Sequence, residues 1–272
     1  MLVFPKAKIN LGLRITGKRP DGYHDIETLF YPVGLCDALE IVRGPEGSEK
    51  DFLTITGNGI PGTTDDNIVL KSARKLRETF PVPWLSIHLH KKIPAGAGLG
   101  GGSSDAAETL RTINRIFGLS VDVQKLKEIA ATLGSDCPFF IESVPAFASG
   151  RGEILTPAPL ILNGYYIVLA NPGIQASTIE AYADCKPALP ETSLEELVSR
   201  PMKEWKDSII NDFEEILFPK YPLIMELKLA FYASGAVFSS MSGSGSTVFG
   251  IYSEKPVIPE NLAKYVIFEA PL

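Results

Sequence analysis

A glycine-rich loop constrains this chain more than any other segment does. Residues 94–104 read PAGAGLGGGSS, between an alternating strand pattern over residues 85–93 and a helical pattern over residues 104–117. Glycines let a backbone approach a ligand closely and turn successive N–H groups toward an anion. Ser103 or Ser104 can cap the following helix, whose N-terminus attracts the same anion. The loop therefore predicts a phosphate-binding site in a fold that mixes strands and helices.

Other interpretations of the loop fit less well. Gly96, Gly98 and Gly101 also match a dinucleotide fingerprint, which needs an acidic residue at the end of a second strand. Asp122 instead opens a helical pattern over residues 123–133. No lysine precedes the two serines, which excludes the P-loop of the Walker type. A flexible linker is disfavoured because patterned elements lie on both sides of the loop.

Length and composition suggest two domains. With 272 residues, of which 45% are hydrophobic, the chain can bury a sizeable core. We expect an α+β protein with a boundary near the proline-rich stretch at residues 156–159, which gives domains 1–157 and 158–272. The expected strands cover residues 3–12, 39–42, 53–56, 85–93, 138–148 and 165–170, and the expected helices cover 67–80, 104–117, 123–133, 192–200, 208–217 and 222–234.

Charge and cysteine content exclude several classes of function. A net charge of -6 without a basic tract argues against a nucleic-acid partner. No apolar run reaches the roughly 18 residues of a membrane span, and the charged start does not resemble a signal peptide, so we expect a cytoplasmic protein. Cys36, Cys137 and Cys185 are odd in number and widely spaced, and we interpret them as free thiols.

Two polar positions point to chemistry on a hydroxyl group. Lys8 and Asn10 share one face of the first strand, although spacing alone favours an edge lysine that reaches solvent. Asp136 lies between a helix end and an apolar segment that we expect to be a strand. An aspartate there is commonly a turn residue, but it can also accept the proton of a phosphoryl acceptor.

Two further segments suggest ligand contacts. Tyr23 and His24 follow a turn, and a stacking ring beside a hydrogen-bonding imidazole suits a heterocyclic base. The cluster at residues 241–250, MSGSGSTVFG, predicts either a hairpin turn or one wall of the site. His88 and His90 share a strand face, but no third ligand has suitable spacing, so no metal site is proposed there.

Four separated motifs together resemble the GHMP kinases. They are AKINL at residues 7–11, RPDGYH at 19–24, GLGGGSS at 98–104 and GSD at 134–136, and the cluster at 241–250 resembles a further glycine motif of the family. The resemblance implies an N-terminal domain of the ribosomal protein S5 domain 2-like fold and a ferredoxin-like C-terminal domain. It also implies a kinase that transfers the γ-phosphoryl group of ATP to a small alcohol.

The resemblance assigns roles residue by residue. Asp136 is expected to accept the hydroxyl proton, with Lys8 keeping it ionised and stabilising charge on the reacting oxygens. Asn67 is expected on the adenine side. Mg²⁺ should accompany ATP, with Ser104, Asp105 and Glu108 as candidate contacts. The triphosphate is expected to be wrapped by Pro94, Ala95, Gly96, Ala97, Gly98, Leu99, Gly100, Gly101, Gly102, Ser103 and Ser104.

The same resemblance implies a substrate that carries a cytidine diphosphate group. Tyr23 and His24 match base-recognition positions, Asn10 is expected in the substrate site, and Thr178 and Tyr182 match a threonine and a second stacking aromatic. The family usually has phenylalanine at this second position. Another GHMP kinase, acting on mevalonate or homoserine, and a catalytically silent sensor are the alternatives. The expected partner is this small molecule, with no nucleic acid and no membrane, and the expected assembly is a monomer or weak homodimer.

Overall fold

The computed structural model describes residues 1–272, apart from the side chain of Ile179. The chain divides into two units, each discontinuous in sequence. Unit 1 comprises residues 1–7, 35–95 and 100–144, and unit 2 comprises residues 8–34, 96–99 and 145–272. The glycine-rich loop thus contributes residues to both units. The boundary at residue 157 stays a prediction.

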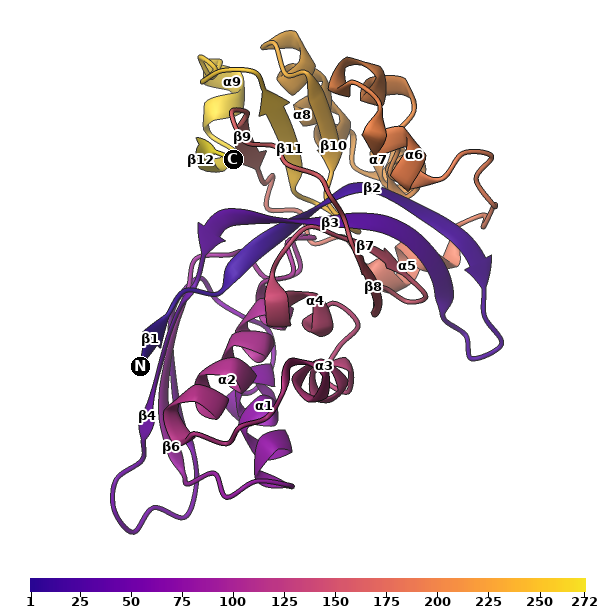
Figure 1. Cartoon of the computed structure of the whole chain (residues 1–272). Coiled ribbons are helices and arrows are strands. Elements are labelled where there is room, and N and C mark those ends of the chain that lie inside the picture. Colours follow the sequence, from indigo (N-terminus) through magenta and orange to yellow (C-terminus); the bar gives the residue numbers. More distant parts are fainter. The chain divides into compact units, whose positions relative to one another are not determined.

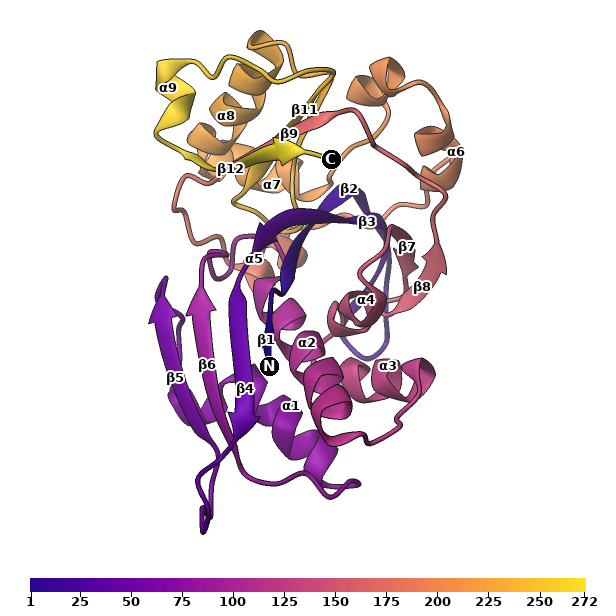
Figure 2. The same cartoon turned by 60° about the vertical axis from the view of Figure 1, so that its left-hand side comes forward.

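Unit 1 is built on a four-stranded sheet with helices against one face (Figures 1 and 2). Side chains of the strand over residues 85–91 alternate as predicted, with Leu85, Ile87 and Leu89 buried and His88 and His90 exposed. The strands, in their order across the sheet, are β1 (Leu2–Val3), β4 (Ala38–Arg43), β6 (Leu85–Lys91) and β5 (Phe52–Gly57). β6 pairs antiparallel with β4 and parallel with β5. The parallel pair requires a crossover, which the helix between β5 and β6 supplies.

The helices of unit 1 begin where the sequence places their caps. Asn67 accepts the N–H of Val69 at 2.9 Å, and Asp122 accepts the N–H of Lys125 at 2.8 Å. Asp122 therefore opens a helix, as predicted, and does not close a strand. The helices are η1 (Thr64–Asp66), α1 (Ile68–Arg77), α2 (Gly101–Phe117), α3 (Val123–Ala131) and α4 (Cys137–Glu142).

The prediction of a strand over residues 138–148 was wrong for its first half. Residues 137–142 form α4, and a strand begins only at Ala146. Pro138 fits the first turn of a helix, where its missing N–H is not needed. An apolar run that is buried on all sides does not show whether it is a helix or a strand, which explains the error.

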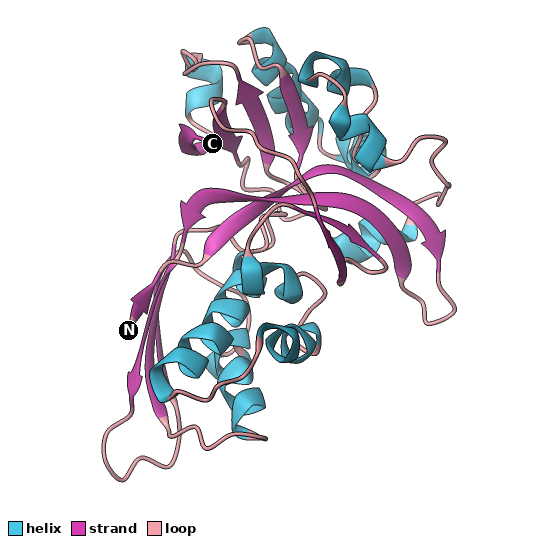
Figure 3. Cartoon of the chain, viewed as in Figure 1, coloured by secondary structure: helices cyan, strands magenta, loops and turns pink.

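Unit 2 contains a sheet of two long and two short strands, clear in Figure 3. Its order is β2 (Lys6–Lys18), β3 (His24–Cys36), β7 (Ala146–Ser149) and β8 (Ile154–Pro157). β2 extends beyond its predicted end, and β3 was not predicted. A turn at residues 19–23 joins these two strands, with the Arg19 N–H donating to the Tyr23 carbonyl at 2.8 Å.

A second sheet in unit 2 provides the other side of its core. Its order is β10 (Phe238–Met241), β11 (Val248–Tyr252), β9 (Tyr166–Ala170) and β12 (Val266–Pro271). Leu13, Ile15 and Ile26 of β2 and β3 pack in one cluster with Phe213 and Phe231. This cluster fixes the strands that carry the predicted site residues of unit 2. The remaining helices are α5 (Thr178–Ala183), α6 (Leu194–Ser199), η2 (Met202–Asp207), α7 (Phe213–Lys220), α8 (Pro222–Ala233) and α9 (Glu260–Ala263).

Candidate functional site

The start of α2 presents backbone N–H groups without a side-chain cap. The helix begins at Gly101, and Gly100 occupies the N-cap position at φ +70° with no side-chain hydrogen bond. The prediction that Ser103 or Ser104 caps α2 was therefore wrong. Gly100 reverses the chain in the left-handed region, so the helix starts earlier and includes both serines. Uncapped N–H groups at a helix N-terminus suit a phosphate group.

The segment with Asp136 lies beside this first turn. The Ser103 hydroxyl hydrogen-bonds with the thiol of Cys137, the residue after Asp136. A Cβ added to Gly134 would lie 4.0 Å from Ser103 Oγ and 3.2 Å from Cys137 Sγ, so glycine permits the close approach. Burial raises the pKa of Cys137 to about 12, which makes it an unreactive thiol. Unit 1 thus brings a half-buried carboxylate to the predicted phosphate helix.

Lys8 in unit 2 is a buried cation rather than an edge residue that reaches solvent. It is 3% exposed, and its Nζ donates to Asn10 Oδ1 at 2.6 Å and to the Gly98 carbonyl at 3.2 Å. The ammonium also lies 5.0 Å from the centre of the Phe30 ring. The solvent-reaching interpretation that spacing favoured was wrong. Backbone pairing of the Lys8 N–H with the Leu99 carbonyl, at 3.0 Å, holds β2 against the loop.

Asn10 orients Lys8 through a chain of hydrogen bonds. Its Nδ2 donates to Thr28 Oγ1 at 2.9 Å, and Thr28 donates to the Gly12 carbonyl at 2.5 Å. Asn10 is 1% exposed, so these contacts fix its Oδ1 toward the ammonium of Lys8. Thr28 was not predicted as a site residue, because β3, on which it lies, was not predicted either.

The second glycine cluster contacts the first, and it is also a hairpin turn between β10 and β11. Ser242 Oγ donates to the Gly98 carbonyl at 2.8 Å and accepts the Asn10 N–H at 3.2 Å. The Thr247 N–H donates to the Ala97 carbonyl at 3.3 Å. The expectation that the 241–250 segment joins the site is supported in unit 2 by these contacts.

The predicted base-recognition residues gather in unit 2. The rings of His24 and Tyr182 stack with centroids 5.1 Å apart and an interplanar angle of 23°. The ring of Tyr182 also packs edge-on against that of Phe213, with centroids 4.9 Å apart, and Phe213 was not predicted as a site residue. Thr178 Oγ1 hydrogen-bonds with Ser244 Oγ at 2.8 Å, which links α5 to the second glycine cluster.

Tyr23 differs from the other aromatic residues of this group. Its side chain is exposed, and the guanidinium of Arg151 lies 4.9 Å from its ring centre. An exposed ring on a turn retains a free face for stacking. Tyr23 thus lies next to His24 in the chain but outside the stack that His24 makes with Tyr182.

Comparison with known proteins identifies the family of this chain. The model described as GHMP kinases N terminal domain matches residues 67–143, and that described as GHMP kinases C terminal matches residues 188–265. A 4-diphosphocytidyl-2-C-methyl-D-erythritol kinase of Bacteroides thetaiotaomicron is 51% identical over 260 residues, which cover 96% of this chain and 95% of that protein. The corresponding enzyme of Bacteroides fragilis is 48% identical over 270 residues, covering 99% and 97%. The chain belongs to the 4-diphosphocytidyl-2-C-methyl-D-erythritol kinase family of GHMP kinases.

A solved structure agrees with this assignment. The crystal structure of a 4-(cytidine 5'-diphospho)-2C-methyl-D-erythritol kinase matches with a TM-score of 0.77 at 33% identity, over 92% of this chain and 89% of that one. The predicted α+β fold and the predicted GHMP kinase family are therefore confirmed. The protein is a small-molecule kinase, and membership of this family implies ATP as its co-substrate. In the part of the chain that the structure describes, no helix is both long and apolar enough to cross a membrane.

The candidate metal contacts of this GHMP kinase do not fit a magnesium site. Ser104 and Asp105 are 1% and 2% exposed, and Lys91 donates to Asp105 at 2.7 Å. Glu108 pairs with Arg111, also at 2.7 Å. Among the described residues, no group of three histidine, cysteine, aspartate or glutamate side chains is placed to hold a metal ion.

Asn67 has a structural role in this kinase whatever its part in nucleotide binding. Its Oδ1 caps α1, as described above, and its N–H donates to the Thr64 carbonyl at 3.1 Å. These contacts hold the side chain at the N-terminus of α1. The adenine contact stays a prediction.

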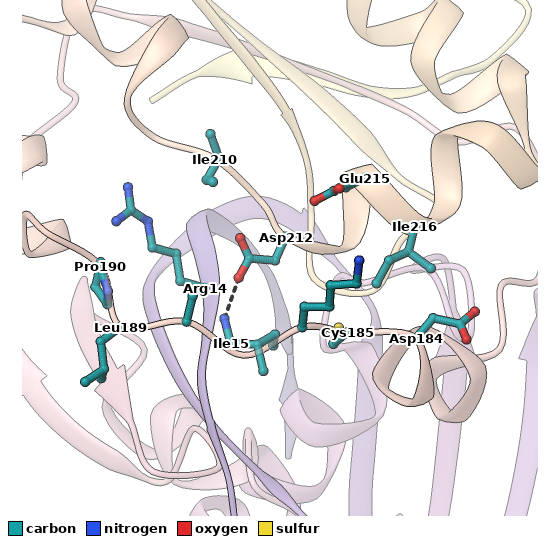
Figure 4. A pocket seen from close by; sticks show the side chains of 12 residues that line it. Arg14, Ile15, Asp184, Cys185, Leu189, Pro190, Ile210, Asp212, Glu215 and Ile216 are labelled. Atoms are coloured by element: carbon teal, nitrogen blue, oxygen red, sulfur yellow. Dashed lines mark hydrogen bonds between the residues drawn. The ribbon is translucent and has the colours of Figure 1, made fainter.

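Unit 2 of the kinase also contains a pocket of about 460 Å³, shown in Figure 4. Its charged lining comes from Arg14, Lys186, Asp184, Asp212 and Glu215. Asp212 accepts the Ile15 N–H at 2.7 Å, and burial raises its pKa above the usual range. The predicted site residues of unit 2 do not line this pocket, although part of its lining, Asp184 to Lys186, follows directly after α5.

Proposed function

We propose that this chain transfers the γ-phosphoryl group of ATP to the 2-hydroxyl of 4-diphosphocytidyl-2-C-methyl-D-erythritol. The products are the 2-phosphate and ADP, in the non-mevalonate route to isoprenoid precursors. The observation that carries this proposal is the 51% identity to a kinase named for this substrate, over nearly the whole of both chains. The contacts of Lys8 and of the segment with Asp136 support it.

Asp136 is the proposed general base. It accepts the proton of the 2-hydroxyl as the oxygen of that group attacks the γ-phosphorus, and the bond from phosphorus to the bridging oxygen of ADP breaks. The proximity of its segment to Ser103 supports this role, because a base for phosphoryl transfer must act near the bound phosphates.

Lys8 is the proposed stabiliser of charge on the reacting oxygens. Its contacts with Asn10 and Gly98 hold the ammonium in one orientation. A preorganised cation in a buried setting acts more strongly than one in water, and it needs no reorganisation during the reaction. In this proposal Asn10 acts on the substrate through Lys8, because both ends of its amide already have protein partners.

The loop from Pro94 to Ser104 is proposed to bind the triphosphate of ATP. The uncapped N-terminus of α2 supports this role, since its N–H groups and dipole favour an anion. Asn67 is proposed on the adenine side. We further propose that Mg²⁺ arrives with ATP, held mainly by phosphate oxygens and water, which is its usual mode of binding in kinases.

The cytidine end of the substrate is proposed to bind at His24 and Tyr182, with Tyr23 and Thr178 nearby. Tyrosine replaces the more common phenylalanine at position 182 but keeps the π face that stacking needs. The stack of His24 on Tyr182 supports a shared role for the two rings. We also propose a cytoplasmic enzyme, a monomer or weak homodimer, whose partner is this small molecule and which binds no nucleic acid.

Phosphorus NMR tests the proposed reaction. The purified protein is incubated with Mg²⁺, ATP and the cytidylyl substrate, with mevalonate and homoserine in parallel. A new phosphomonoester signal with the cytidylyl substrate alone is expected. Transfer to mevalonate or homoserine instead would refute the substrate, and ATP binding without any transfer would favour a sensor.

A substitution tests the base. Asp136→Asn should lower turnover by roughly 10²- to 10⁴-fold while ATP still binds, because the amide cannot take the hydroxyl proton. Asp122→Asn is the matched control, since it alters an exposed aspartate that begins a helix in the same unit. Unchanged turnover in Asp136→Asn would refute the assignment of the base.

A further inference from the structure

Three buried charged residues lie together in unit 1, and the proposed reaction uses none of them. Lys91 ends β6, Asp37 joins β3 to β4, and Asp105 lies in α2. Their exposed fractions are 3%, 1% and 2%. Removing charged groups from water is costly, and it is tolerated only when the partners are well placed. We call Asp37, Lys91 and Asp105 the buried triad.

Each contact of the buried triad joins separate parts of the chain. Lys91 Nζ donates to Asp37 Oδ2 and, at 2.7 Å, to Asp105 Oδ2. Asp37 Oδ1 accepts the N–H groups of Lys92 at 2.6 Å and Ile93 at 2.8 Å. One ammonium group therefore ties the end of β6 and the junction of β3 and β4 to α2.

The triad lies directly under the start of the phosphate helix. A Cβ added to Gly101, the first residue of α2, would lie 2.8 Å from Ile93 Cγ2 and 3.3 Å from Lys91 Nζ. Asp37 thus fixes the backbone just before Pro94, where the loop begins, and Asp105 fixes α2 just after Ser104, where the loop ends. A glycine-rich loop loses much conformational freedom when it is ordered, so fixing both of its ends reduces that cost.

We propose that Asp37, Lys91 and Asp105 are positioning residues for the phosphate loop, which hold the first turn of α2 where its N–H groups bind the triphosphate of ATP. This inference rests on the proposed role of residues 94–104 in ATP binding. The triad acts through the backbone of the loop and does not touch the substrate. Breaking it should therefore weaken the use of ATP and leave the binding of the alcohol substrate unchanged.

Asp105 offers the cleanest pair of substitutions. Its Oδ2 accepts from Lys91, whereas its Oδ1 has no hydrogen-bond partner among the described residues. Asparagine keeps an oxygen for Lys91 in the same place, and alanine removes it. The positioning role therefore predicts that Asp105→Asn rescues what Asp105→Ala loses.

Steady-state kinetics separate positioning from a structural role alone. Asp105→Ala should raise the KM for ATP at least tenfold, with the KM for the cytidylyl substrate within twofold of wild type. Asp105→Asn should keep the KM for ATP within threefold. Thr109→Val is the matched control, because Thr109 is equally buried on the next turn of α2 and its hydroxyl donates only to the Asp105 carbonyl at 2.7 Å. It should lower the melting temperature without changing either KM.

The results of these experiments test the positioning role of the triad separately from the proposed reaction. An unchanged KM for ATP in folded Asp105→Ala would overturn the positioning role, and so would an equal rise in Thr109→Val. If Asp105→Ala does not fold, the triple variant Asp37→Asn, Lys91→Met and Asp105→Asn carries the same expectation, since it leaves no buried ion of the triad without its partner. A wild-type protein that binds ATP but transfers nothing would overturn the proposed reaction and not the triad.

Discussion

At Gly98 the two glycine clusters lie so close together that no side chain fits between them. Its φ is +77°, and an added Cβ would overlap the carbonyl oxygen of Ser242 and lie 3.2 Å from that of Gly245. Gly96→Ala meets only the strain of a left-handed backbone, because nothing lies within 4 Å of its Cβ position. We expect Gly96→Ala to cost about 1–2 kcal/mol in the free energy of unfolding and Gly98→Ala clearly more. Urea denaturation measures both, and equal losses would contradict the close contact with Ser242.

Individual residues show what the sequence could reveal about the site. Lys8 and Asp136 are predicted as site residues because their motifs match a family, whereas spacing alone favoured structural roles for both. The burial of Lys8 depends on Gly98, which is 90 residues away in the chain. The buried triad is equally non-local, since Asp37 and Lys91 are 54 residues apart. Local pattern carries no information on such pairs, so these contacts required the structure.

At the scale of elements, the ion pair that joins α2 to the end of β6 predicts a pH dependence. Burial raises the pKa of Asp105 to about 7, opposed by the charge of Lys91 and aided by that of Asp37. The folded chain thus keeps a proton on Asp105 between about pH 4 and pH 7, where the unfolded chain has already released it. This contribution to stability is fully present below that window and is lost as the pH rises through about 7.

Asp105→Asn removes this titration and should flatten the dependence. The urea midpoint of wild type, measured from pH 5 to pH 8, should fall more steeply than that of the variant, because only the wild type must ionise a buried carboxyl group. Comparing the two slopes cancels the titration of all other groups that the proteins share. Parallel slopes would show that Asp105 does not titrate in this range.

Elements with a strong local pattern were predicted well, and the others were not. The strand at β6 and the helices α1, α2 and α3 follow clear apolar periodicities. β3 was missed because Pro32 and Gly34 interrupt its pattern, and one of its two neighbours in the sheet, β7, lies more than a hundred residues away in the sequence. α4 was predicted as a strand because its short apolar run lacks a polar face. In both cases tertiary contacts, and not local propensity, select the structure.

For the molecule as a whole, the net charge opposes the binding of anionic ligands. The chain carries a net charge of -6, yet ATP and the proposed cytidylyl substrate are both polyanions. Attraction must therefore be local, and two described groups, each in its own unit, are suited to it: the N-terminus of α2 in unit 1 and the ammonium of Lys8 in unit 2. These groups do not match the charge of a triphosphate, so a cation bound to the nucleotide itself is the natural complement.

Metal removal tests whether the cation is held by the nucleotide or by the protein. Because no cluster of metal-ligating side chains occurs among the described residues, EDTA should leave the melting temperature of the nucleotide-free protein unchanged. The same EDTA should abolish phosphoryl transfer, and added Mg²⁺ should restore it. With a non-hydrolysable ATP analogue, the melting temperature should rise more in Mg²⁺ than in EDTA, since tighter binding to the folded state stabilises it by mass action. A fall in melting temperature on adding EDTA without nucleotide would instead indicate a metal site held by the protein itself.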